Sequence, residues 1–122
     1  MRKIVVVDRN PHIRRLVQRE LTSAGYMVFA PVSETELMDL FSGKNRVDLL
    51  IIDPEVLGNN LNLVTNRICE FYPDLPVIVH SLAVDKDEPL PFKAVLGRIE
   101  KNWDSIGELK KVMAKMITRN SH

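Results

Sequence analysis

The chain has 122 residues, with 17 Lys and Arg against 16 Asp and Glu, and a single cysteine. This length suits one domain that buries roughly two thirds of its unfolded surface, so we expect a single domain over residues 1–122 with an ordered core over about residues 3–118. The formal net charge of +1 argues against direct nucleic-acid binding, and the lone cysteine excludes an internal disulfide. Because no secretory leader or run of about twenty apolar residues occurs, the sequence predicts a cytoplasmic protein without a membrane partner.

Short apolar runs recur along the chain and predict five strands. They cover residues 4–7, 26–30, 47–53, 77–81 and 93–101. The third run lacks polar alternation, which is typical of a parallel strand that is covered on both faces. Because amphipathic segments separate the strands, we expect a parallel sheet with right-handed crossovers.

The amphipathic segments predict four helices. They cover residues 11–24, 33–41, 61–71 and 104–117. Asn10 suits the N-cap of the first helix, Pro11 suits its first turn, and Gly25 ends it with a positive φ. Ser33 and Glu36 have the spacing of a capping box. Methionines in the apolar stripe of the last helix are interpreted as core residues rather than ligand-binding residues.

The connection over residues 82–93 breaks the alternation of strands and helices. Pro89 and Pro91 remove two backbone donors and disfavour helical geometry before them, so we expect an irregular and mobile connection in place of a helix. We also expect few apolar anchors, and therefore fast amide exchange from about Val84 to Phe92.

Four polar residues follow the ends of predicted strands. They are Asp8, Asp53, Ser81 and Lys101. The carboxyl ends of parallel strands meet at one edge of a sheet, where ligands bind. Two carboxylates suit a hard cation such as Mg²⁺, while a hydroxyl and an ammonium group can hold phosphoryl oxygens. The sequence therefore predicts a site for a divalent cation and a phosphoryl group; it has no zinc-type Cys/His set and no glycine-rich phosphate loop.

These residues, in this order, resemble the receiver domains of response regulators in two-component signal transduction. The resemblance covers nearly the whole chain and includes "IID" with Asp53, Gly58 in the loop after it, and "KNWD" from Lys101, where the family usually has Lys-Pro-Phe-Asp. It implies a flavodoxin-like (βα)5 fold of the α/β class. That fold is a doubly wound, five-stranded parallel sheet of order 2-1-3-4-5, here with a degenerate fourth helix.

The resemblance also implies roles for individual residues. Asp53 would be the phosphoacceptor. Asp8, Asp53 and the backbone carbonyl of Glu55 would hold Mg²⁺, while Ser81 and Lys101 would bind the phosphoryl group and switch with it. The partner would be a histidine kinase or a histidine phosphotransfer protein, and the phosphoprotein would signal through protein contacts rather than act as an enzyme.

Arg9 departs from the family pattern because a second acid usually follows the first strand. A guanidinium at this position should weaken Mg²⁺ binding through charge repulsion. We expect Arg9 to bridge the carboxylates of Asp8, Asp53 or Glu55 when no metal is bound. The alternative is an Arg9 side chain that extends into solvent.

Three other residues need separate interpretation. Leu82 stands where the family prefers a very small residue, so it is expected to restrict access to the phosphoryl site. Arg98 occupies a position that is usually aromatic and changes orientation on activation. His80 is interpreted as a packed, hydrogen-bonded histidine rather than a metal ligand.

The sequence leaves alternative functions open. A phosphorylatable receiver is favoured because both Asp53 and Lys101 are present. A pseudo-receiver would keep the fold and bind partner proteins without phosphorylation. An unrelated flavodoxin-like enzyme has little support beyond the fold, and the oligomeric state stays open.

Overall fold

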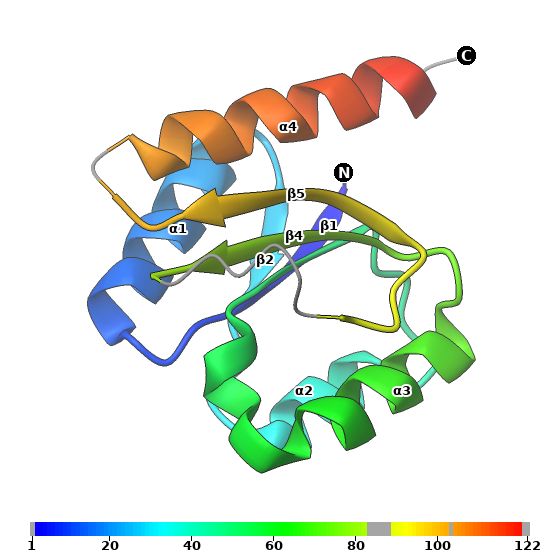
Figure 1. The fold of residues 1–122 in the computed structure, drawn as a ribbon. Helices are drawn as coiled ribbons and strands as arrows, with labels where there is room; N and C mark the ends of the chain where they lie inside the picture. Colours follow the sequence, from blue (N-terminus) through cyan, green and yellow to red (C-terminus); the bar gives the residue numbers. More distant parts are fainter. Residues whose placement is uncertain (1, 83–88, 103, 121–122) are drawn as a thin grey trace.

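The computed structural model describes residues 2–82, 89–102 and 104–120, which form five parallel strands and the helices around them (Figure 1). The strands are β1 (Lys3–Val7), β2 (Met27–Phe29), β3 (Leu49–Ile52), β4 (Pro76–Ser81) and β5 (Ala94–Glu100). Their order in the sheet is β2-β1-β3-β4-β5. This confirms the predicted doubly wound, flavodoxin-like sheet.

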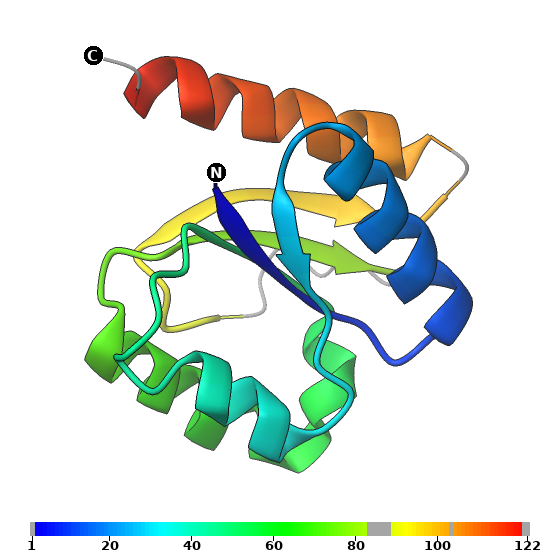
Figure 2. The same ribbon diagram turned by 180° about the vertical axis from the view of Figure 1, so that it is seen from behind.

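The helices form one layer on each face of the sheet, as Figures 1 and 2 show from opposite sides. One layer contains α1 (Pro11–Ser23) and α4 (Ser105–Asn120). The other contains α2 (Glu34–Leu40), the 3-10 segment η1 (Pro54–Asn60) and α3 (Leu61–Phe71). No helix in the described ranges is long and apolar enough to cross a membrane.

The alternating side chains of β1 enter two separate hydrophobic cores. Ile4 and Val6 pack in the core beneath α1 and α4, whereas Val5 and Val7 pack in the core beneath α2 and α3. Burial on both faces explains why this strand has no polar alternation. The first polar side chain after this apolar strand is that of Asp8, at the carboxyl edge of the sheet.

The ends of α1 agree with the caps predicted from the sequence. The Asn10 side chain accepts hydrogen bonds from the backbone N–H groups of His12 at 2.9 Å and Ile13 at 3.3 Å. Gly25 follows the helix with a φ of 99°, a conformation that favours glycine. The cap fixes the short loop between β1 and α1, and this loop carries Asp8 and Arg9.

The described part of the connection between β4 and β5, residues 89–93, contains neither a helix nor a strand. The predicted fast exchange over Val84 to Glu88 lies outside the described residues. The expectation of few apolar anchors is wrong for the part that follows, because Phe92 is buried and Leu90 packs against the same core as α3. Both side chains tie the end of this irregular connection to the sheet.

Candidate functional site

Asp8 and Asp53 lie next to each other at the carboxyl edge of the sheet. β1 and β3 pair in parallel with Val7 opposite Ile52, and the Asp53 backbone N–H donates to the Val7 carbonyl at 2.9 Å. The next residue of each strand is therefore an aspartate that emerges at the same edge. Both aspartates are buried.

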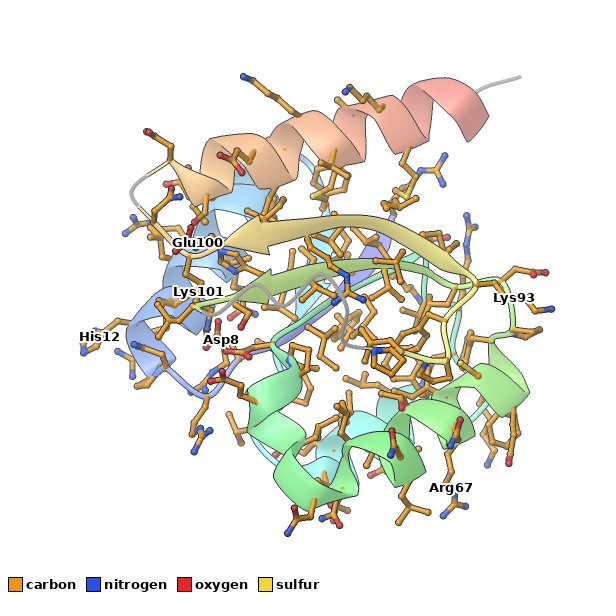
Figure 3. All side chains as sticks on the ribbon, viewed as in Figure 1. Asp8, His12, Arg67, Lys93, Glu100 and Lys101 are labelled. Atoms are coloured by element: carbon orange, nitrogen blue, oxygen red, sulfur yellow. The ribbon has the colours of Figure 1, made fainter. Side chains whose placement is uncertain are left out.

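Lys101 joins the two aspartates. Its Nζ lies 2.9 Å from Asp8 Oδ2 and 2.7 Å from Asp53 Oδ2. The exposed fractions of the three side chains are 6% for the lysine and 3% and 9% for the aspartates. Figure 3 shows Lys101 and Asp8 together at this edge, and Lys93 at the opposite end of β5. Three buried charges thus form one cluster in which a single ammonium group serves two carboxylates.

The backbone directs Lys101 into this cluster. β5 pairs with β4 up to Glu100 opposite Ser81, and the Lys101 N–H donates to the Ser81 carbonyl at 2.9 Å. Burial alone would lower the pKa of Lys101, but its hydrogen bonds to Asp53 and Asp8 outweigh that effect and raise the pKa above its usual value. The ammonium group therefore stays charged at neutral pH.

The other carboxylate oxygens also have partners. Asp8 Oδ1 accepts a hydrogen bond from the Asn10 N–H at 2.9 Å, and Asp53 Oδ1 accepts one from the Glu55 N–H at 3.1 Å. Asp53 therefore caps the following turn and holds Lys101 at the same time. Arg14 Nη1 donates to the Asp8 carbonyl at 3.0 Å. Sequence reasoning missed this role of Arg14, although its place in the first turns of α1 already put it near the strand end.

Arg9 makes a different contact from the predicted one. Its side chain is exposed, and Nη2 donates to the backbone carbonyl of Glu55 at 3.3 Å. It forms no ion pair with a carboxylate among the described residues, so the predicted bridge by Arg9 is wrong and Lys101 makes that bridge instead. The reason is position, because the Lys101 side chain is buried at this edge after β5, whereas the Arg9 side chain is exposed.

The remaining predicted site residues lie at different depths. Ser81 is buried at the end of β4, beside the cluster, whereas the Leu82 side chain is 66% exposed. Arg98 is half-buried within β5, opposite Val79, and precedes the edge. His80 is buried as expected, but its Nε2 has no hydrogen-bond partner within residues 2–82, 89–102 and 104–120, so the expectation of a hydrogen-bonded histidine is wrong for this atom there.

Comparison with protein-family models finds no match, and neither does comparison with curated proteins. Solved structures do match. The response regulator TrrA of Thermotoga maritima, in complex with Mg²⁺-BeF, has a TM-score of 0.77 and 28% identity over 95% of this chain and 99% of its own. TrrA in complex with the histidine kinase ThkA has a TM-score of 0.70 and 28% identity, and the match covers 93% of this chain and 99% of TrrA. A response regulator receiver domain protein of Clostridium thermocellum has a TM-score of 0.78 and 20% identity, and the match covers 99% of this chain and 98% of that protein. The fold is that of a response-regulator receiver domain.

The oxygen atoms at the acidic edge of the sheet fit a hard cation in their chemistry. The carboxylates of Asp8 and Asp53 and the carbonyl of Glu55 are the kinds of ligand that Mg²⁺ accepts. Both Oδ2 atoms are held by Lys101, and the carbonyl accepts a hydrogen bond from Arg9. In the described part of the chain no three His, Cys, Asp or Glu side chains are grouped to hold a metal. A metal ion must therefore compete with two cationic side chains of the protein.

Proposed function

We propose that this receiver is phosphorylated on Asp53 by a histidine kinase or a histidine phosphotransfer protein and then signals through protein contacts. The supporting observation is the buried Asp53 carboxylate, held at 2.7 Å by the Lys101 ammonium group beside Asp8. A buried carboxylate cluster at the carboxyl edge of a parallel sheet is where ligands bind in this class of fold. In this proposal the chain is a phosphoprotein and not an enzyme.

The chemistry assigns each group one task. An Asp53 carboxylate oxygen forms a bond to phosphorus, the bond from phosphorus to the donor imidazole nitrogen breaks, and that nitrogen keeps the electron pair. Lys101 balances the added negative charge, and the Ser81 hydroxyl binds a phosphoryl oxygen. Mg²⁺, held by Asp8, Asp53 and the Glu55 carbonyl, would supply further positive charge at the phosphoryl oxygens. Arg9 makes this metal binding weak.

The proposed partner must bring a phosphohistidine to the edge that carries Asp53. The complex of TrrA with the histidine kinase ThkA supports a kinase as this partner. Leu16 of α1 and Leu82 after β4 are large apolar side chains exposed near this edge, and they suit contact with another protein. The proposal places this encounter in the cytoplasm, without nucleic acid or membrane contact, and Leu82 is still expected to limit access to Asp53.

One observation favours the pseudo-receiver as a second candidate. Lys101 and Arg9 already occupy the oxygens that would hold a metal. A pocket that is neutralised by its own side chains can be stable without any ligand. In that case the fold would present a constant binding surface.

Phosphodonor labelling separates the two candidates. The protein is incubated with acetyl phosphate or phosphoramidate and Mg²⁺, and its intact mass is measured. We expect one added phosphoryl group in the wild type and in Asp74→Asn, whose aspartate is exposed in the loop between α3 and β4. We expect none in Asp53→Asn.

Two results would contradict the proposal. Labelling of Asp53→Asn at the wild-type level would exclude Asp53 as the acceptor. No labelling of the wild type with several donors and metals would favour the pseudo-receiver instead.

A further inference from the structure

A cavity of about 290 Å³ lies beside the acidic pocket, between the start of α1 and the start of α4. Aliphatic side chains from three places line it, namely Ile13 and Leu16 of α1, Ile106 of α4 and Leu82 after β4. Lys101 lines the cavity as well as the acidic pocket. The cavity lies at the lower end of the size range of small-molecule sites, and its walls are largely apolar.

His80 also lines this cavity and carries a buried polar atom without a partner. Its side chain belongs to β4, on the same face as Ile78, and only 2% of the residue is exposed. Among the residues that the structure describes, Nε2 has no hydrogen-bond partner. By contrast, Ser105 Oγ donates to the Asn102 carbonyl at 2.9 Å, and Lys101 Nζ holds its two carboxylates. A buried ring nitrogen without a partner is rare, and a ligand group in the cavity can supply that partner.

The surroundings define which ligand group suits His80. Burial lowers the pKa of the imidazole, and the charge of Lys101 lowers it further, against the opposing effect of Asp8 and Asp53. The ring is therefore neutral at neutral pH, and Nε2 either accepts or donates one hydrogen bond. A hydroxyl group can satisfy either form because it is both donor and acceptor. A cationic ligand is disfavoured by the aliphatic walls and by the ammonium group of Lys101.

We propose that this cavity binds a small uncharged molecule that has an apolar body, such as one aromatic ring, and a single hydroxyl group that pairs with His80 Nε2. An apolar cavity of about half this volume accepts a benzene ring, so a substituted ring fits. Leu82 is 66% exposed and Leu16 is 40% exposed. Both can change rotamer at the cavity to admit the ligand. The site is separate from the phosphoacceptor chemistry of Asp53 and does not depend on it.

Paired titrations with p-cresol and toluene test the hydroxyl contact, because the two molecules share the ring and methyl group and differ in the hydroxyl. Binding is followed by amide NMR in the wild type and in His80→Leu. We expect saturable binding of both probes at millimolar concentration in the wild type, with shifts at Ile13, Leu82 and Ile106. The ratio of cresol affinity to toluene affinity should fall about fivefold in His80→Leu, the usual size of one hydrogen-bond contribution. An unchanged ratio, or no saturable binding in the wild type, would overturn the proposal.

Two further measurements guard against a His80→Leu variant that does not fold. With ¹⁵N-labelled histidine in the wild type, p-cresol should shift the Nε2 resonance of His80 and toluene should shift it much less. His12→Gln and His122→Gln identify the other two imidazoles. Ile106→Trp, which fills the cavity from α4, should abolish binding of both probes. An unmoved His80 nitrogen, or binding retained in Ile106→Trp, would contradict the assignment.

Discussion

The acidic pocket and the neighbouring cavity share Lys101, yet they differ in whether their buried polar atoms have hydrogen-bond partners. In the pocket, all four carboxylate oxygens of Asp8 and Asp53 have a partner in Lys101 or the backbone. In the cavity, His80 Nε2 has no partner in the described part of the chain. The carboxylate oxygens of the pocket are therefore paired before any ligand binds, whereas the imidazole nitrogen in the cavity is not.

This difference shows where ligand binding costs the protein energy and where it releases it. A cation entering the pocket must displace Lys101 from two carboxylates and Arg9 from the Glu55 carbonyl, so part of its binding energy is lost to that exchange. A hydroxyl entering the cavity gives a buried nitrogen its first partner. Substitutions in either region test this difference.

Lys101→Met should have the largest effect on stability. It leaves two buried carboxylates without their ammonium partner, which costs about 3–5 kcal/mol of unfolding free energy. Urea denaturation measures the loss, and Mg²⁺ should restore part of it because the freed oxygens become available. The matched control is Lys93→Met, an exposed lysine at the other end of β5, which should change stability by less than about 0.5 kcal/mol. Equal losses in both variants would show that the cluster contributes little.

Arg9→Asp should tighten Mg²⁺ binding by about tenfold, or about 1.4 kcal/mol. The change removes a cation from the Glu55 carbonyl and adds a carboxylate beside the pocket. Without metal, the same variant should melt at a lower temperature because more carboxylates share one edge. Isothermal titration and thermal melting test both effects, with Arg15→Asp on the exposed face of α1 as the control. If Arg9→Asp behaves like that control, Arg9 has no electrostatic role.

His80→Leu should raise stability at pH 7 by about 1 kcal/mol, because an apolar side chain replaces a buried polar atom without a partner. The same substitution should also remove part of the loss of folding stability at acidic pH. Burial and Lys101 hold the folded pKa of His80 below the ordinary 6.5, so the unfolded state binds its proton first and stability falls as the pH drops below 6.5 toward the folded pKa. Denaturation across this range compares wild type with His80→Leu and with the exposed His12→Gln. A wild-type slope retained in His80→Leu would assign it to other groups.

Arg14→Met should have the smallest effect. It removes the hydrogen bond to the Asp8 carbonyl, which contributes about 1 kcal/mol, while helix propensity stays nearly the same. Arg15→Met changes the next residue of α1, which is exposed, and should stay within about 0.5 kcal/mol of wild type. Indistinguishable stabilities would mean that Arg14 does not help to position Asp8.

Much of the carboxyl edge of the sheet was predictable, because the apolar runs of β1 and β3 each stop at a polar residue. Apolar runs that stop at Asp8 and Asp53 predict both the buried strands and the positions of the two carboxylates at the strand ends. The caps at Asn10 and Gly25 were equally local, because they depend on side-chain chemistry and backbone conformation within a few residues. Patterns of this kind depend on neighbouring residues only, so the sequence predicts them without knowledge of the tertiary contacts.

The contacts that decide the chemistry were less predictable because they join distant parts of the chain. Lys101 and Asp53 are 48 residues apart, and only the strand pairing shows that the lysine, rather than Arg9, reaches both carboxylates. The burial of Phe92 likewise depends on how an irregular connection returns to the sheet. The two prolines predicted the irregular backbone found over residues 89–93, but not the apolar contacts.

The claim that Asp53 is a phosphoacceptor held ready by Lys101 is tested most directly by titrating the protein with beryllofluoride and Mg²⁺ under amide NMR. We predict saturable shifts at the amides of Asp53, Ser81 and Lys101 only when both components are present, and none in Asp53→Asn. A wild-type spectrum that stays unchanged, or identical shifts in Asp53→Asn, would contradict that claim.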